Sequence, residues 1–123
     1  MTRSEMENHA RAWIDAWNRR DVDAVLGHYV DDAVFVSPKA LTFVGTARIS
    51  GKDKLAAYWH TASQKIQTLV FRLDRVICDP EARELVVLYD ATLNGTTSRA
   101  CELMRFDAAG RQIGGEALYG AVL

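Results

Sequence analysis

The sequence predicts a single α+β domain in which N-terminal helices pack on a curved, mostly antiparallel β-sheet. Three observations support this prediction. Apolar residues recur with helical spacing before residue 67, and strand-like runs separated by turn signals fill residues 69–122. Between two of these runs, Asn94-Gly95 is typical of a tight hairpin, because both turn positions favour a positive φ.

Composition limits the function classes. The 123 residues suffice for one domain, residues 1–123, with one core. A net charge of −1 does not indicate the basic surface that binds nucleic acid. No apolar run approaches the roughly 20 residues that span a bilayer. We therefore expect neither a nucleic-acid nor a membrane partner. Because the N-terminus lacks an apolar signal segment, we expect a cytoplasmic location.

Three helices are predicted in the first half of the chain. Ser4 and Glu7 have the spacing of a capping box at the start of a helix over residues 4–19. Asp21 is expected to cap a short second helix that runs through Leu26. Ser50 and Asp53 are expected to open a third helix. The predicted apolar faces of the first and third helices carry Met6, Ala10, Trp13 and Trp17, and Leu55, Tyr58, Trp59, Ala62 and Ile66.

The predicted strands begin after Asp31-Asp32, a pair that favours a turn over a catalytic dyad. Residues 33–37 are expected to form a short strand that Pro38 ends, because proline has no N–H for the ladder. Residues 41–49 are a less regular strand candidate. Turns are expected at residues 79–81, 94–95 and 107–110, and they separate predicted strands at residues 69–77, 84–93, 96–106 and 112–122.

Alternation along residues 96–106 singles out one carboxyl group. Arg99 and Arg105 share one face, which is the better outer face, so Glu102 should point inward beside Ala100 and Met104. Burial should raise the pKa of Glu102, because desolvation disfavours a charged carboxylate. Such a group can donate a hydrogen bond or shuttle a proton. In the alternative, Glu102 pairs with an arginine or reaches solvent at the open end of the sheet.

A ligand cavity is predicted beside Glu102. Ile113, Gly115, Ala117 and Tyr119 are expected on one face of the last strand, where the two small residues leave room. In the alternative, the tryptophans fill this space. The expected substrate-binding wall consists of Trp13, Trp17, Phe35, Tyr58, Trp59, Tyr89, Ala100, Met104 and Tyr119. No metal site is expected, because His9, His28 and His60 lack a common ligand spacing, and Cys78 and Cys101 are expected to be reduced.

Four short motifs give the chain a family resemblance over residues 12–122. They are Trp13-Ile14 with Asp21-Val22-Asp23-Ala24, Tyr29-Val30-Asp31-Asp32-Ala33, Gly51 before Leu55-Ala56-Ala57-Tyr58, and Leu103-Met104-Arg105-Phe106-Asp107 with Gly110-Arg111. On these residues the chain resembles the SnoaL-like and ketosteroid isomerase-like branch of the nuclear transport factor 2-like superfamily. The resemblance implies a cone-shaped fold around one apolar pocket.

The same resemblance places individual residues at functional positions. Ser37 falls where ketosteroid isomerases have their aspartate base, Trp13 at their oxyanion tyrosine, and Glu102 at their carboxylic-acid donor. Tyr29 matches one supporting tyrosine, and Trp59 replaces another. Because serine cannot remove a carbon-bound proton without a base of its own, ketosteroid isomerisation by that mechanism is not expected.

These arguments predict a cofactor-independent isomerase, cyclase or lyase acting on an apolar, carbonyl-bearing molecule. Glu102 would be its acid or base, with Tyr29 and Ser37 as the other catalytic candidates. The alternative is a non-catalytic ligand carrier or a dimerisation module of the same fold. A homodimer is expected because the predicted outer sheet face is too apolar for solvent, and this face is the common dimer interface of the family. Its apolar residues are Val70, Val86, Leu88, Leu103 and Leu118.

Overall fold

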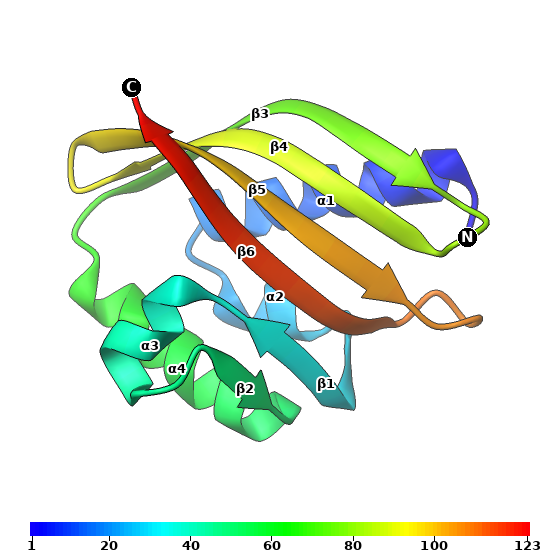
Figure 1. Ribbon diagram of the computed structural model, residues 1–123, viewed down its shortest axis with the longest axis horizontal. Helices are drawn as coiled ribbons and strands as arrows, with labels where there is room; N and C mark the ends of the chain where they lie inside the picture. The colour runs from blue at the N-terminus through cyan, green and yellow to red at the C-terminus, as the bar shows by residue number, and fades with distance from the viewer.

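The computed structural model describes residues 1–123 as one curved six-stranded sheet with helices on its concave face (Figure 1). The elements in chain order are α1 (Arg3–Asn18), α2 (Val22–Leu26), β1 (Tyr29–Val36), α3 (Pro38–Val44), β2 (Arg48–Ser50), α4 (Lys52–Lys65), β3 (Leu69–Asp79), β4 (Glu84–Leu93), β5 (Thr96–Phe106) and β6 (Gln112–Val122). The strand order is β2-β1-β6-β5-β4-β3, and only β1 and β6 pair in parallel. The predicted α+β cone, with its mostly antiparallel sheet, is confirmed.

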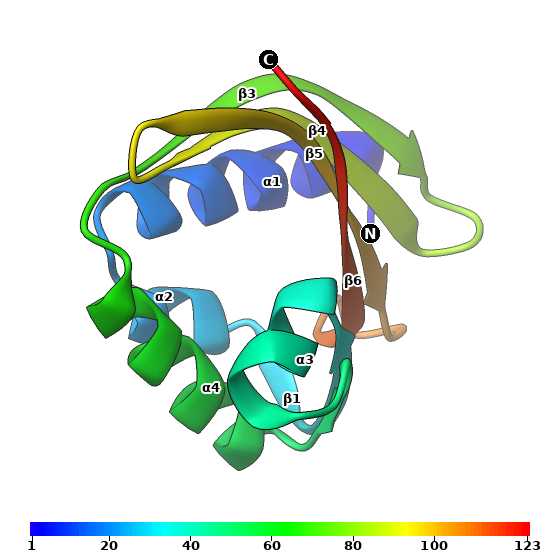
Figure 2. The same cartoon turned by 60° about the vertical axis from the view of Figure 1, so that its left-hand side comes forward.

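Figure 2 shows the sheet curving around α1, with α2 and α4 on the other side of the interior. Helix α1 begins at a different capping box from the predicted one. Thr2 Oγ1 accepts from the Glu5 backbone N–H at 3.1 Å, and Glu5 Oε1 accepts from the Thr2 N–H at 3.0 Å. The predicted pair, Ser4 and Glu7, has the same spacing as Thr2 and Glu5. The helix uses Thr2 and Glu5, so Ser4 lies inside its first turn.

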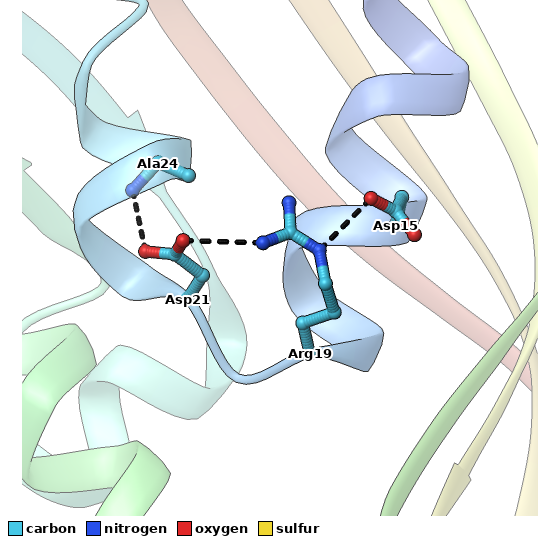
Figure 3. A network of polar contacts seen from close by, with 4 residues as sticks. All are labelled: Asp15, Arg19, Asp21 and Ala24. Carbon is cyan, nitrogen blue, oxygen red and sulfur yellow. Dashed lines mark hydrogen bonds and ion pairs between the residues drawn. The ribbon is translucent and has the colours of Figure 1, made fainter.

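A chain of exposed polar contacts connects α1 to α2 (Figure 3). Arg19 Nε donates to Asp15 at 2.9 Å, and its guanidinium also donates to Asp21 at 3.3 Å. The other oxygen of Asp21 accepts from the Ala24 N–H at 3.0 Å, so the predicted cap of α2 is confirmed. Exposed ion pairs contribute little energy, and the cap is the stronger determinant of where α2 begins.

The prediction for residues 31–50 was wrong in three places. Asp31 and Asp32 lie exposed within β1, at an irregularity in its pairing with β6, and do not form a turn. Residues 38–44 form helix α3 because Pro38 stands at its first position and Ser37 Oγ caps it, accepting from the Lys39 N–H at 3.2 Å. Strand β2 is therefore only three residues long. Helix α4 begins after Gly51, without a side-chain cap from Ser50.

The second half of the chain follows the prediction closely. All four long strands lie within two residues of their expected bounds, and Asn94 and Gly95 have φ values of 51° and 84° at their hairpin. One face assignment was wrong. Pairing between β5 and β6 shifts after Arg105, so Gln112 is completely buried while Ile113 is exposed. Gly115 and Ala117 do face the interior, as predicted.

Strand β3 is one edge of the sheet, and an α1 side chain pairs with part of it. The Asn18 amide donates to the Phe71 carbonyl at 2.9 Å and accepts from the Phe71 N–H at 2.7 Å. This two-bond contact replaces a neighbouring strand at that position and holds the end of α1 against the sheet.

Candidate functional site

A cavity opens between the concave face of the sheet and helices α1, α3 and α4. The cavity itself has a volume of about 80 Å³. The empty space reaches about 640 Å³ when the open mouth is included. Most lining side chains are aromatic or aliphatic. Nine predicted site residues line it, namely Trp13, Trp17, Phe35, Ser37, Tyr58, Trp59, Tyr89, Glu102 and Tyr119.

Aromatic contacts make the cavity narrow. Trp13 stacks on Phe71 with ring centroids 5.7 Å apart and meets Tyr89 edge-to-face at 5.3 Å. Trp17 meets Trp59 edge-to-face at 5.4 Å. One alternative was that the tryptophans fill the interior of the cone. They fill part of it and leave a space beside Glu102. A bound molecule would be compact at its inner end, and a longer one would extend through the mouth.

Glu102 lies in the wall of this cavity, on β5. Its strand neighbours are Val87 and Ala117, both apolar, and the side chain is only 3% exposed. Its Oε2 is buried without a hydrogen-bond partner. Burial raises the pKa of Glu102 to about 8, so the carboxyl is mostly neutral at pH 7 and carries a proton that it can donate.

Trp13 provides a second unpaired polar group in the same wall. Its indole Nε1 is buried and has no hydrogen-bond partner. Native proteins leave few buried polar atoms unpaired, because each one costs about 1–3 kcal/mol. Both residues line one cavity, and a ligand group that reached these two atoms would provide the missing hydrogen-bond partners.

Five residues with hydroxyl groups line the cavity, and three of them lie close to one another. Ser37 stands at the end of β1, while Tyr58 and Tyr119 come from α4 and β6. Burial raises the pKa of both phenols, and the neighbouring Ser37 side chain partly offsets this effect. Both tyrosines therefore stay protonated at neutral pH and can donate hydrogen bonds to a ligand.

Three predicted site residues do not line the cavity. Ala100 and Met104 are buried in the core next to it. Tyr29 is also completely buried, and its hydroxyl accepts from Gln112 Nε2 at 3.0 Å. Burial, followed by the charge of Glu102, raises the Tyr29 pKa well above its ordinary value. The structure thus brings Ser37 and Glu102 to one cavity and leaves Tyr29 outside its wall.

Gln112 connects Tyr29 to a buried histidine. Gln112 Oε1 lies 3.1 Å from His9 Nε2, so the neutral ring donates this bond. Burial, with the nearby His28, lowers the His9 pKa to about 4. His60 lies far along the chain on α4 and contacts Asp23 at 3.1 Å. No cluster of three His, Cys, Asp or Glu side chains that could hold a metal ion is present.

Sequence reasoning missed part of the cavity wall. Lys39 and Phe43 belong to α3, a helix that was not predicted and that overlaps the strand candidate at residues 41–49, and Ser37-Pro38 was the signal that could have identified it. Phe71 lies on the inner face of β3, where partial alternation had left the facing undecided. The other lining residues outside the predicted site are Ala62, Ser63, Ile66, Leu69 and Leu93. Ala117 also lines the cavity, where it was expected to leave room.

Comparison with known proteins assigns this architecture to a family. The sequence pattern of the SnoaL-like domain matches residues 10–113. The chain belongs to the SnoaL-like family. No curated protein sequence matches this SnoaL-like protein significantly. None of its helices is long and apolar enough to cross a membrane.

Solved structures similar to this SnoaL-like protein share its fold over nearly the whole chain. A SnoaL-like protein of unknown function from Burkholderia thailandensis is 30% identical, with a TM-score of 0.86 over 98% of this chain and 99% of that one. An NTF2-like protein of unknown function from Cytophaga hutchinsonii is 14% identical, with a TM-score of 0.70 over 94% and 89%. A protein from Shewanella denitrificans, provisionally named a SnoaL-like polyketide cyclase, is 14% identical, with a TM-score of 0.76 over 96% and 92%.

Proposed function

We propose that this SnoaL-like protein binds a compact, mostly apolar, carbonyl-bearing molecule and acts on it as a cofactor-independent isomerase, cyclase or lyase. The observation that carries the proposal is the buried carboxyl of Glu102, a residue that lines the cavity and whose Oε2 has no hydrogen-bond partner. A ligand carbonyl would accept a hydrogen bond from the neutral carboxyl. The family membership and the provisionally named cyclase with the same fold are consistent with such chemistry.

In this proposal Glu102 is the acid and the proton shuttle. With a pKa of about 8, both protonation states are populated near neutral pH, so the carboxylate form can take an α-proton from carbon as the C–H electron pair moves into the enolate. The carboxylic acid formed in this way can then return a proton to carbon. The Trp13 N–H would donate to charge that develops on the ligand. Ser37, Tyr58 and Tyr119 would orient the molecule through their hydroxyl groups.

Exchange of carbonyl α-protons tests this proposal. β-Tetralone in D₂O, followed by proton NMR, reports enol formation and its binding to the protein in one experiment. We expect wild-type protein to accelerate exchange about 100-fold or more, as positioned acid–base groups do. Glu102→Gln keeps the size and a hydrogen-bond donor but cannot titrate, so it should bind β-tetralone and lose the acceleration. Equal exchange by both proteins would contradict a chemical role for Glu102.

A carrier without catalytic activity is the second candidate. One observation favours it, namely that Ser37 occupies the end of β1, where it provides a hydroxyl and no carboxylate base. A carrier would bind β-tetralone without accelerating exchange in the wild-type protein. The same NMR experiment therefore separates the two functions.

We further propose that the outer sheet face joins two copies of the chain. Val70 and Leu118 on this face are 56% and 46% exposed, and Val86, Leu88 and Leu103 are half-buried beside them. Arg99 lies on the same face between Asp90 and Asp74, so both charge signs are present and a second copy would meet complementary groups. Sedimentation should give twice the 13.7 kDa of one chain, and Leu118→Lys should give the monomer. A monomeric wild-type protein at high concentration would refute this interface.

A further inference from the structure

One cation at the cavity mouth has no assigned partner. Lys39 is the second residue of α3, which lies beside α4 (Figure 2). Its side chain is half-buried and lines the cavity, with Nζ 4.3 Å from the centre of the Tyr119 ring. No carboxylate lies within ion-pair distance of this ammonium group. Apart from the phenols of Tyr58, Tyr89 and Tyr119, Lys39 and Glu102 are the only ionisable side chains in the cavity wall.

A second hollow begins where the first one ends. Lys39, Leu93 and Tyr119 line both hollows, so the Lys39–Tyr119 pair stands at their boundary. The second hollow adds the hydroxyl groups of Thr96 and Ser98. A molecule too long for the inner cavity would pass this boundary and meet one ammonium group and two hydroxyl donors.

The electrostatics of this boundary favour an anion. Burial lowers the Lys39 pKa, because the ammonium group loses water and gains no negative partner. Glu102 does not compensate it, since that carboxyl is mostly neutral at pH 7. An anionic ligand group beside Lys39 would restore the missing charge partner. A carboxylate or sulfonate could also accept hydrogen bonds from the two hydroxyl groups.

We propose that Lys39 binds an anionic group of the ligand, so that the preferred ligand is an apolar acid whose uncharged end enters the cavity beside Glu102. This inference rests on the ligand cavity of the proposed function and names its substrate class. Apolar contacts in the aromatic wall would hold the body of the molecule. Lys39 would set its direction, because only one end carries charge.

Two fluorescent probes separate the cavity from the anion site. Anilinonaphthalene sulfonate and N-phenylnaphthylamine have the same ring system, and only the first carries an anionic group. Titration of both probes into the wild-type protein, Lys39→Met and Lys39→Arg measures each dissociation constant. Lys65→Met is the matched control, because Lys65 Nζ also lies over an aromatic ring, that of Phe43 at 5.2 Å, but Lys65 lines neither hollow.

We expect Lys39→Met to weaken sulfonate binding about 10-fold, as for loss of a partly desolvated charge pair, while N-phenylnaphthylamine binding changes by less than about twofold. Lys39→Arg should retain sulfonate binding, and Lys65→Met should leave both probes unaffected. Equal sulfonate affinity in the wild-type protein and Lys39→Met, or an equal loss in Lys65→Met, overturns the anion site. Failure of the wild-type protein to bind N-phenylnaphthylamine instead refutes the cavity itself, and the proposed function with it.

Discussion

Replacement of Glu102 by glutamine should change how the stability of the protein depends on pH. Glu102 has a pKa of about 8 in the folded protein, against 4.5 for an ordinary glutamate, because its carboxylate would be desolvated. Between these two pH values the folded protein holds a proton that the unfolded chain releases. The free energy of unfolding contributed by this group therefore falls as pH rises, by about 1.4 kcal/mol per pH unit.

The whole interval from pH 4.5 to about 8 corresponds to a loss on the order of 5 kcal/mol. The group's contribution is fully present below pH 4.5 and is lost as pH passes through about 8. Glu102→Gln cannot titrate, so the difference in unfolding free energy between wild type and variant should decrease across this window and level off above it. Urea unfolding at several pH values measures this difference, and Glu116→Gln, on the outer face of β6, is the matched control for removing one carboxylate. Parallel stability profiles for the wild-type protein and Glu102→Gln would refute a buried, titrating carboxyl and the site built on it.

Three further substitutions test the interior and the sheet edge. The wild-type protein should lose stability as pH falls from 6.5 to about 4, because His9 binds a proton more readily in the unfolded chain, and His9→Leu should not show this loss. At pH 7 the same variant should lower the free energy of unfolding by about 1–3 kcal/mol, because Gln112 Oε1 is left unpaired. Urea unfolding measures both effects. Gly115→Ala places a methyl group 3.2 Å from a buried phenol oxygen and should cost about 1–3 kcal/mol in thermal unfolding. Gly120→Ala, whose methyl group would meet nothing closer than 3.5 Å, should cost nothing, and equal losses would refute the packing argument. Asn18→Ala removes two hydrogen bonds and should raise amide exchange at the β3 edge, with unchanged exchange counting against the contact.

The inward position of Glu102 could be predicted from sequence because it depends only on strand alternation. Two arginines on one face of residues 96–106 identify the outer side, and period 2 then places Glu102 inside without any knowledge of the neighbouring strands. The hairpin at Asn94-Gly95 is similarly local. Such features need no tertiary information, which is why they were predicted correctly.

Other parts of the site depend on pairing irregularities that leave no mark in the sequence. The shift in β1 pairing after Tyr29 and the shift in β5 pairing after Arg105 change which side chains face inward. As a result, the Tyr29 hydroxyl accepts a hydrogen bond from Gln112, and Tyr29 does not line the cavity. Helix α3 was missed for another reason, since Ser37-Pro38 is compatible with both a strand end and a helix start, and the cavity wall contributed by Lys39 was missed with it.

The strand order has a consequence for how this chain reaches its native state. Strand β1 is the first strand along the chain, yet it pairs with β6, the last strand. Strands β3 to β6, by contrast, are sequential antiparallel neighbours that can zip together locally. We expect a chain stopped before Gln112 to leave β1 with β2 alone and the aromatic interior open to protease. Resistance of such a chain to limited proteolysis would show that the helices close the cone before the final strand completes it.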